Sequence, residues 1–143
     1  MADLKDTVAK AVTAFHETLY RTTGGRLGGR VMGMPVLLLT TTGRKTGKRR
    51  TTPLTYLDDG ERIVLVASYG GSPQHPTWYL NLSAHPEVEV TRGSRTGPML
   101  TRTATAEEKA ELWPRVTKMY KGYAAYQERT ARDIPLVILT EPA

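Results

Sequence analysis

Apolar residues recur along this chain at spacings that change from the helical period to the strand period. Residues 4–22 carry apolar side chains at helical intervals, which predicts an amphipathic helix. Its apolar positions are Leu4, Val8, Ala11, Val12, Phe15 and Leu19. The glycine-rich stretch 24–29 that follows predicts a flexible connector.

Short β-prone runs separated by turn residues dominate the rest of the chain. They predict strands at residues 36–41, 51–57, 62–68, 88–92, 98–105 and 134–140. Helical patterns lie between them at 76–84, at 105–120, which opens with a capping box from Thr105 to Glu108, and at 123–130 after Gly122. About six mostly antiparallel strands, with helices at the start, middle and end, predict an α+β fold with a barrel-like sheet rather than a doubly wound parallel sheet.

Composition narrows the class of protein. The chain has 143 residues, 39% hydrophobic and 24% charged, which is typical of one soluble globular domain. It has no apolar run of membrane-spanning length and no signal-peptide pattern at its start, so we expect a cytoplasmic location. Zero cysteines exclude disulfides and thiolate chemistry, and His16, His75 and His85 lack metal-ligand spacing, so no metal site is predicted.

The positive charge is concentrated in one predicted turn. The formal net charge of +6 indicates an anionic partner, which leaves nucleic acid, anionic lipid and a polyanionic small molecule open. The loop 40–50 joins two predicted strands and carries Gly43, Gly47 and five cations, namely Arg44, Lys45, Lys48, Arg49 and Arg50. Backbone N–H groups and cationic side chains at a hairpin tip suit a phosphate or clustered carboxylates. The glycine spacing fits neither a Walker A loop nor a dinucleotide fingerprint, and a solvated hairpin without a ligand stays an alternative.

Three other segments are candidates for a site. The first runs from Ser68 to Gly71 at the end of a predicted strand, and its hydroxyl and N–H groups could face the edge of a flat ring. The second is the aromatic stretch 75–82, and the third is Tyr120, Tyr123 and Tyr126, which could line the mouth of a pocket. Each has a plain alternative: an ordinary strand exit, core packing and helix packing, respectively.

Together these segments resemble the deazaflavin-dependent nitroreductases and F420H2-dependent quinone reductases of actinobacteria. The resemblance covers roughly residues 35–142 and keeps its spacing throughout. The matching stretches are Leu38–Gly47, Arg50 with Pro53–Leu54, Ala67–Ser68 with Gly70–Gly71, Pro76–Leu82, Trp113–Pro114, Met119–Tyr120, Tyr123, Tyr126 and Ile134–Pro135. It implies a split β-barrel like those that bind FMN, and coenzyme F420, an 8-hydroxy-5-deazaflavin, as the cofactor.

The resemblance also implies roles for individual residues. The anion-binding loop falls on Arg44, Lys45 and Arg50, which would hold the phosphate and glutamyl carboxylates of the cofactor tail. The implied cofactor-binding set is Thr42, Gly43, Arg44, Lys45, Arg50, Pro53, Ala67, Ser68, Gly70, Gly71 and Trp78. The implied catalytic set is Ser68 at the ring edge, Tyr126 as the hydroxyl on the substrate side, and Tyr120 and Tyr123 in the pocket wall. Two positions depart from relatives: Tyr69 stands where Lys is common and Thr55 where Tyr is common.

The expected function is therefore hydride transfer from reduced coenzyme F420 to a planar, electron-poor acceptor such as a quinone, with nitroimidazoles reduced adventitiously. The expected domains are 1–30, the N-terminal helix and connector, and 31–143, the deazaflavin-binding split barrel. One rival is a cofactor-binding protein with little turnover. A second is a nucleic-acid binder that uses the basic hairpin, but aromatic residues are not interleaved with the cations there, so no nucleic-acid partner is predicted. For the N-terminal helix, packing on the barrel is favoured over peripheral contact with the inner face of the cell membrane.

Overall fold

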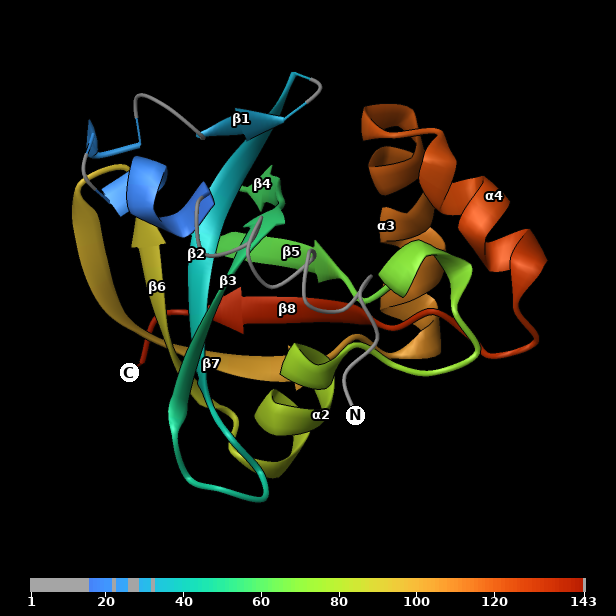
Figure 1. Ribbon diagram of the computed structural model, residues 1–143. Helices are drawn as coiled ribbons and strands as arrows, with labels where there is room; N and C mark the ends of the chain where they lie inside the picture. Colours follow the sequence, from blue (N-terminus) through green and yellow to red (C-terminus); the bar gives the residue numbers. More distant parts are fainter. Residues whose placement is uncertain (1–15, 22, 26–28, 32, 143) are drawn as a thin grey trace, which may run out of the picture.

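A curled antiparallel sheet forms the centre of the molecule (Figure 1). The computed structural model describes residues 16–142, apart from 22, 26–28 and 32. Along the sheet the strand order is β1-β2-β6-β7-β8-β5-β4, and β3 pairs with β2 beside that path. The strands are β1 (Arg30–Val31), β2 (Met34–Thr42), β3 (Arg49–Thr55), β4 (Leu57–Asp59), β5 (Arg62–Val66), β6 (Glu87–Arg92), β7 (Arg95–Thr103) and β8 (Leu136–Thr140).

The predicted strand 51–57 is two strands, because the chain changes partners at Tyr56. β3 pairs with β2 up to Thr55, the N–H of Tyr56 donates to the carbonyl of Pro35, and β4 then pairs with β5. β7 begins three residues before the expected position, since the pairing Arg92↔Arg95 leaves only a two-residue turn. Gly93 in that turn has a φ of 61°. The strands expected at 62–68 and 134–140 are shorter, at 62–66 and 136–140.

Helices cover the two faces of the sheet (Figure 1). They are α2 (Thr77–Ala84), α3 (Ala106–Met119) and α4 (Gly122–Arg129), with a short 3-10 turn η1 at Tyr69–Gly71. The predicted capping box is confirmed, because the Thr105 hydroxyl accepts from the N–H of Glu108 and the Glu108 carboxylate accepts from the N–H of Thr105. Tyr120 ends α3 in an extended conformation, so the three tyrosines come from two helices rather than from one helix face.

Two apolar layers hold these elements together. The inner core lies between the curled sheet and α2 and includes Leu37, Leu39 and Trp78. The outer core lies between the sheet and helices α3 and α4, and includes Leu112 and Val116. Successive strand residues point to opposite faces, and β2 is buried at almost every position because both of its faces are covered.

The described end of the N-terminal helix packs on the sheet through Tyr20. This side chain is 1% exposed, lies against Val36 and Leu38, and its hydroxyl accepts from the N–H of Gly93 at 2.7 Å. Burial raises the pKa of the Tyr20 phenol. Most of the predicted apolar stripe (Leu4, Val8, Ala11, Val12 and Phe15) lies outside the described residues, and the boundary at residue 30 stays a prediction. Among the described residues, no helix has the length and apolar character needed to cross a membrane.

Candidate functional site

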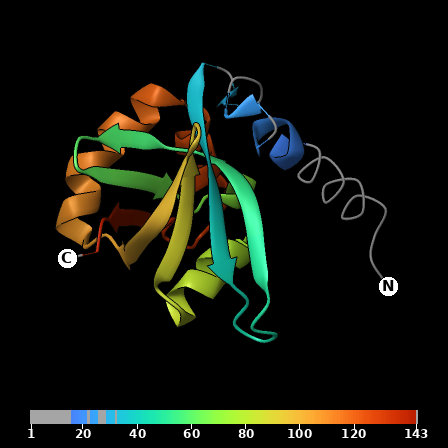
Figure 2. The same cartoon turned by 90° about the vertical axis from the view of Figure 1, so that its left-hand side faces the viewer.

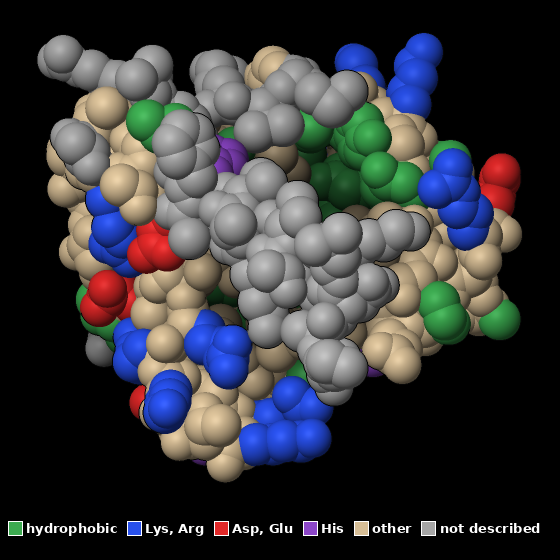
Figure 3. Space-filling model, in the orientation of Figure 1, with side chains coloured by type: hydrophobic (Ala, Val, Ile, Leu, Met, Phe, Trp, Pro, Cys, Tyr) green, Lys and Arg blue, Asp and Glu red, His purple; other side chains and the backbone are tan. Residues whose placement is uncertain are grey.

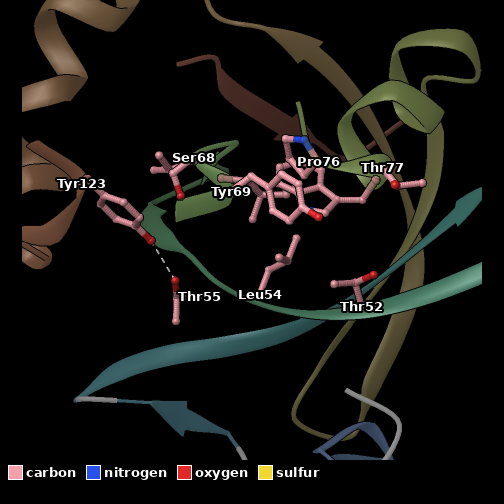
Figure 4. Close-up of a pocket in the computed structure, with 11 residues that line it drawn as sticks. Thr52, Leu54, Thr55, Ser68, Tyr69, Pro76, Thr77 and Tyr123 are labelled. Carbon is pink, nitrogen blue, oxygen red and sulfur yellow. Dashed lines mark hydrogen bonds between the residues drawn. The ribbon is translucent and has the colours of Figure 1, made fainter. Parts of the chain in front are cut away.

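A cavity of about 410 Å³ opens between β3, the end of β5, α2 and α4 (Figure 4). Small-molecule sites typically measure roughly 300–1,000 Å³. In Figure 4 the hydroxyls of Ser68, Tyr123 and Thr55 lie toward one end, and Thr52 and Thr77 toward the other. The lining residues are Thr52, Leu54, Thr55, Leu65, Val66, Ser68, Tyr69, Pro76, Thr77, Trp78 and Tyr123. The cavity thus combines apolar walls with hydroxyl groups at its edges.

One face of β3 leads from this cavity to the basic hairpin. Side chains alternate along a strand, so Leu54, Thr52 and Arg50 share a face. The β2 residues that pair with them are Leu37, Leu39 and Thr41, respectively. The two leucines belong to the inner core beneath α2, and Arg50 therefore continues, on the α2 side, the row that lines the cavity.

The predicted hairpin is confirmed, and most of its cations have no ion-pair partner among the described residues. β2 and β3 pair as far as Thr42↔Arg49, and the N–H of Gly43 donates to the carbonyl of Lys48 at 2.8 Å. Figures 2 and 3 show the hairpin extending beyond the sheet near α2, and Lys and Arg side chains gathered around that end of the molecule. Arg49 binds Thr42 and lies 4.0 Å from Glu89. Within the described part of the chain, four exposed side chains of the hairpin form no ion pair: Arg44, Lys45, Lys48 and Arg50.

Asn81 joins the hairpin to α2, a role that the sequence did not reveal. Its side chain is 2% exposed, its Oδ1 accepts from the N–H of Arg44 at 3.1 Å, and its Nδ2 donates to the Thr41 hydroxyl at 3.3 Å. The available signal was a polar residue at helical spacing from Trp78 and adjacent to Leu82, both of them buried. Asn81 fixes the start of the basic loop relative to the wall that carries Trp78.

The Ser68 turn has an unusual backbone. Tyr69, Gly70 and Gly71 have φ values of 46°, 64° and 79°, a left-handed run that only glycine adopts without cost. A Cβ on Gly71 would lie 2.8 Å from the carbonyl oxygen of Tyr126, so this glycine permits the turn to approach α4. Gly70 is exposed, and neither glycine is among the residues that line the cavity.

Arg132 holds the same turn from behind, and it was also missed. Its guanidinium donates to the carbonyls of Ala67 at 3.1 Å, Ser68 at 2.6 Å and Ser72 at 2.8 Å, and lies 3.3 Å from Nδ1 of His75. Burial lowers the pKa of Arg132; burial, and secondarily the Arg132 charge, lowers the pKa of His75. A lone arginine in an irregular segment gave no sequence signal for this role.

The three tyrosines form one cluster, but only Tyr123 lines the cavity. Its side chain is 6% exposed and its hydroxyl lies 2.9 Å from the Thr55 hydroxyl. The hydroxyls of Tyr120 and Tyr126 are 3.1 Å apart, and the ring centroids within the cluster are 5.0–6.3 Å apart. Burial raises the pKa of Tyr123, and the hydrogen bond with Tyr120 raises that of Tyr126.

The structure therefore brings together only part of the predicted set. Ser68, Trp78 and Tyr123 line the cavity, and Arg50 lies on β3 two residues before the lining residue Thr52. Ala67 is fully buried behind it, and Thr55 and Tyr69, the two departures from relatives, both line it. The predicted residues outside the lining are Thr42, Gly43, Arg44, Lys45, Arg50, Pro53, Ala67, Gly70, Gly71, Tyr120 and Tyr126.

Comparison with known proteins identifies the family. A family model described as F420H(2)-dependent quinone reductase matches residues 13–141. This chain belongs to that family. It is 44% identical over 129 residues to an F420H(2)-dependent quinone reductase of Mycobacterium tuberculosis, covering 87% of each chain. Membership confirms the predictions of the family, of an F420H2-dependent oxidoreductase and of coenzyme F420 as the cofactor.

Solved structures confirm the predicted split-barrel class. An F420-H2 dependent reductase is 40% identical, with a TM-score of 0.67, and the alignment covers 73% of this chain and 93% of that one. A structure described as a domain-swapped dimer is 36% identical, with a TM-score of 0.70 over 96% and 99% of the two chains. HutZ, a haem storage protein of Vibrio cholerae, is 13% identical with a TM-score of 0.56, covering 76% and 82%, and it shows the fold alone.

Proposed function

We propose that this protein transfers a hydride from reduced coenzyme F420 to a quinone. One observation carries the proposal: a row of β3 side chains joins a hydroxyl-edged cavity to a hairpin on which four of the five cations form no ion pair within the described chain. A cofactor with a flat ring and a polyanionic tail needs both sites, at a separation that one strand spans. A quinone is proposed as the acceptor because the family and its mycobacterial relatives are described as quinone reductases.

The hairpin side chains would bind the tail. Arg44, Lys45 and Arg50 are exposed and form no ion pair among the described residues. Charge-assisted hydrogen bonds contribute about 1.5–3 kcal/mol each, so a few of them account for micromolar affinity. Asn81 holds the loop through the backbone N–H of Arg44, so this contact does not involve a cationic side chain.

The cavity residues would hold and orient the ring. When bound, reduced coenzyme F420 supplies the hydride. Trp78 and Leu54 offer apolar walls, and the Ser68 hydroxyl, which borders the cavity and has no side-chain hydrogen bond among the described residues, is available to the ring edge.

Reduction of the acceptor also needs a proton. A quinone that gains a hydride becomes a hydroquinone monoanion, and one proton on its oxygen completes the hydroquinone. From the sequence, Tyr126 was the substrate-side donor; we assign that role to Tyr123, because Tyr123 lines the cavity and Tyr126 does not. Tyr120 and Tyr126 would then fix the orientation of Tyr123 through ring contacts.

A second acceptor class fits the same cavity. Nitroimidazoles are planar and electron-poor, and the nitro group would lie where a quinone oxygen lies. Their reduction is proposed as an adventitious activity, slower than that of quinones. Comparing menadione with a nitroimidazole in one steady-state assay tests which acceptor is reduced faster. Faster reduction of the nitroimidazole would contradict the proposed order.

Titration with oxidised coenzyme F420 tests the cofactor site directly. Fluorescence should report saturable binding at micromolar concentration, and FMN, which lacks the glutamyl tail, should bind much more weakly. Ser68→Ala should weaken F420 binding, because the hydroxyl would touch the ring, while Ser83→Ala on the exposed side of α2 serves as the matched control. Equal binding of F420 by the wild type and by Ser68→Ala would remove Ser68 from the ring site.

A further inference from the structure

Three carbonyl groups of the Ser68 turn converge on a single side chain. They belong to Ala67, Ser68 and Ser72, and all three accept from the Arg132 guanidinium within 3.1 Å. Ala67 is fully buried and Ser68 is 8% exposed, so the carbonyls of these two residues have little access to water, whereas Ser72 is half-buried. Buried carbonyls need hydrogen-bond partners, and here one residue supplies a partner for all three.

The turn needs such a restraint because of its backbone. Tyr69, Gly70 and Gly71 form the left-handed run described above, and the three carbonyls flank that run on both sides. A non-glycine residue held with positive φ persists only when its surroundings fix it. Two backbone bonds inside the turn, from Gly71 to Ser68 and from Ser72 to Tyr69, do not connect it to the rest of the protein.

Arg132 makes that connection, and the partner is the helix that carries Tyr123. The Arg132 carbonyl accepts from Nε2 of Gln127 in α4 at 2.8 Å, and Oε1 of Gln127 accepts from the N–H of Ile134 at 2.9 Å. The backbone of Arg132 is thereby fixed to α4, and its guanidinium to the Ser68 turn. The two cavity hydroxyls of Ser68 and Tyr123 lie on the two segments that Arg132 joins.

We propose that Arg132 is a positioning residue, which sets the Ser68 hydroxyl and the Tyr69 ring relative to Tyr123 so that ring and acceptor meet in a reactive arrangement. It does not line the cavity and touches no reacting atom. The role requires the planar fork of arginine, because its N–H groups point in fixed, separate directions, whereas the lysine ammonium is a single point. This inference rests on the proposed function for its kinetic consequences, but the restraint itself can be measured without turnover.

The kinetic test uses Arg132→Lys, Arg132→Ala and, as the matched control, Arg95→Ala, which removes an exposed arginine from β7 outside the site. In oxidation of reduced F420 by menadione, Arg132→Lys should lower kcat about tenfold or more. Its cofactor Kd should change less than about threefold, because the hairpin supplies the tail contacts. Arg95→Ala should match the wild type in both. Wild-type kcat in Arg132→Lys would overturn the proposal.

Chemical rescue separates positioning from general stability. Truncation to alanine leaves three carbonyls facing a space shaped for a guanidinium ion, so millimolar guanidinium or ethylguanidinium should restore turnover of Arg132→Ala several-fold. A loss caused by general destabilisation would not be restored, because guanidinium is a denaturant. A folded Arg132→Ala that guanidinium fails to rescue would contradict the proposal.

Hydrogen exchange tests the restraint independently of the proposed function. Amides in residues 67–75 should exchange about tenfold faster in Arg132→Ala than in the wild type, while those of β2 and β6 stay unchanged. If the wild type shows no quinone-dependent turnover but this exchange difference is present, the function fails and the restraint stands. Unchanged exchange in residues 67–75 would eliminate the restraint.

Discussion

At the scale of single residues, the cavity presents a few hydroxyl groups. Neighbouring residues that would touch no reacting atom hold these groups in place. The backbone of Tyr69 is strained, since a left-handed conformation costs a non-glycine residue about 1–2 kcal/mol. Its ring is 59% exposed and lines the cavity, so the conformation presents an aromatic face at the cavity instead of burying it. That exposed ring suits a planar acceptor and is one reason to expect quinones rather than aliphatic substrates.

The proton-donor assignment predicts a difference between two phenols. Tyr123→Phe keeps the ring and removes the O–H, so turnover with menadione should fall about tenfold, equivalent to ~1.4 kcal/mol of barrier. Tyr126→Phe, the matched change in the same cluster, should retain most of the activity. Steady-state kinetics beside a cofactor titration measure both. The reverse order would restore the donor role to Tyr126.

At the scale of secondary-structure elements, close approach of the Ser68 turn to α4 depends on Gly71. Gly71→Ala adds a methyl group 2.8 Å from the Tyr126 carbonyl oxygen at a φ of 79°. Gly60→Ala is the matched control, because Gly60 has a φ of 71° but no atom within 4 Å of the added Cβ. Both should lose about 1–2 kcal/mol from backbone strain, and Gly71→Ala should lose clearly more. Equal losses in chemical denaturation would show that the approach is not tight.

The first turn of α3 predicts how stability depends on pH. Arg102, and then the N–H of Thr105, lower the pKa of Glu108 to about 2. Because the folded pKa lies below the ordinary value, this contribution is present above about pH 4.5 and is lost as pH falls toward 2. Glu108→Gln should therefore flatten the fall of Tm over that range, whereas Glu107→Gln, in the same turn and exposed, should not. Parallel curves for Glu108→Gln and the wild type would contradict this.

The sequence predicted the elements well where local patterning decides them. The capping box, the basic hairpin and the breaks at glycines are local features, and the structure confirms them. Patterning failed at Tyr56, where a strand changes partners. Arg132 and Asn81 were missed for the same reason: each acts by bonding across 37 to 65 positions of sequence, which no local pattern encodes.

At the scale of the whole molecule, we propose that one hairpin supplies the positive charge that binds the cofactor tail. Replacing Arg44 and Lys45 together by Ala should weaken coenzyme F420 binding about a hundredfold, since each charge-assisted bond contributes about 1.5–3 kcal/mol. The double variant Arg92→Ala with Arg95→Ala removes the same charge from the β6–β7 hairpin and should bind normally. Wild-type binding should weaken with added salt, and the Arg44/Lys45 variant should show a shallower dependence. Equal affinity in both double variants would place the tail elsewhere.

From the fold, the cavity and the hairpin together, we propose that this protein passes a hydride from reduced coenzyme F420 to a quinone. Anaerobic steady-state oxidation of reduced F420 with menadione tests it most directly, followed by the absorbance of the oxidised deazaflavin. The account predicts oxidation that requires both protein and quinone, saturates with each substrate, and falls in Ser68→Ala and Tyr123→Phe. Folded protein that binds the cofactor yet oxidises it no faster with quinone than the protein-free control would contradict the account and leave a cofactor-binding protein.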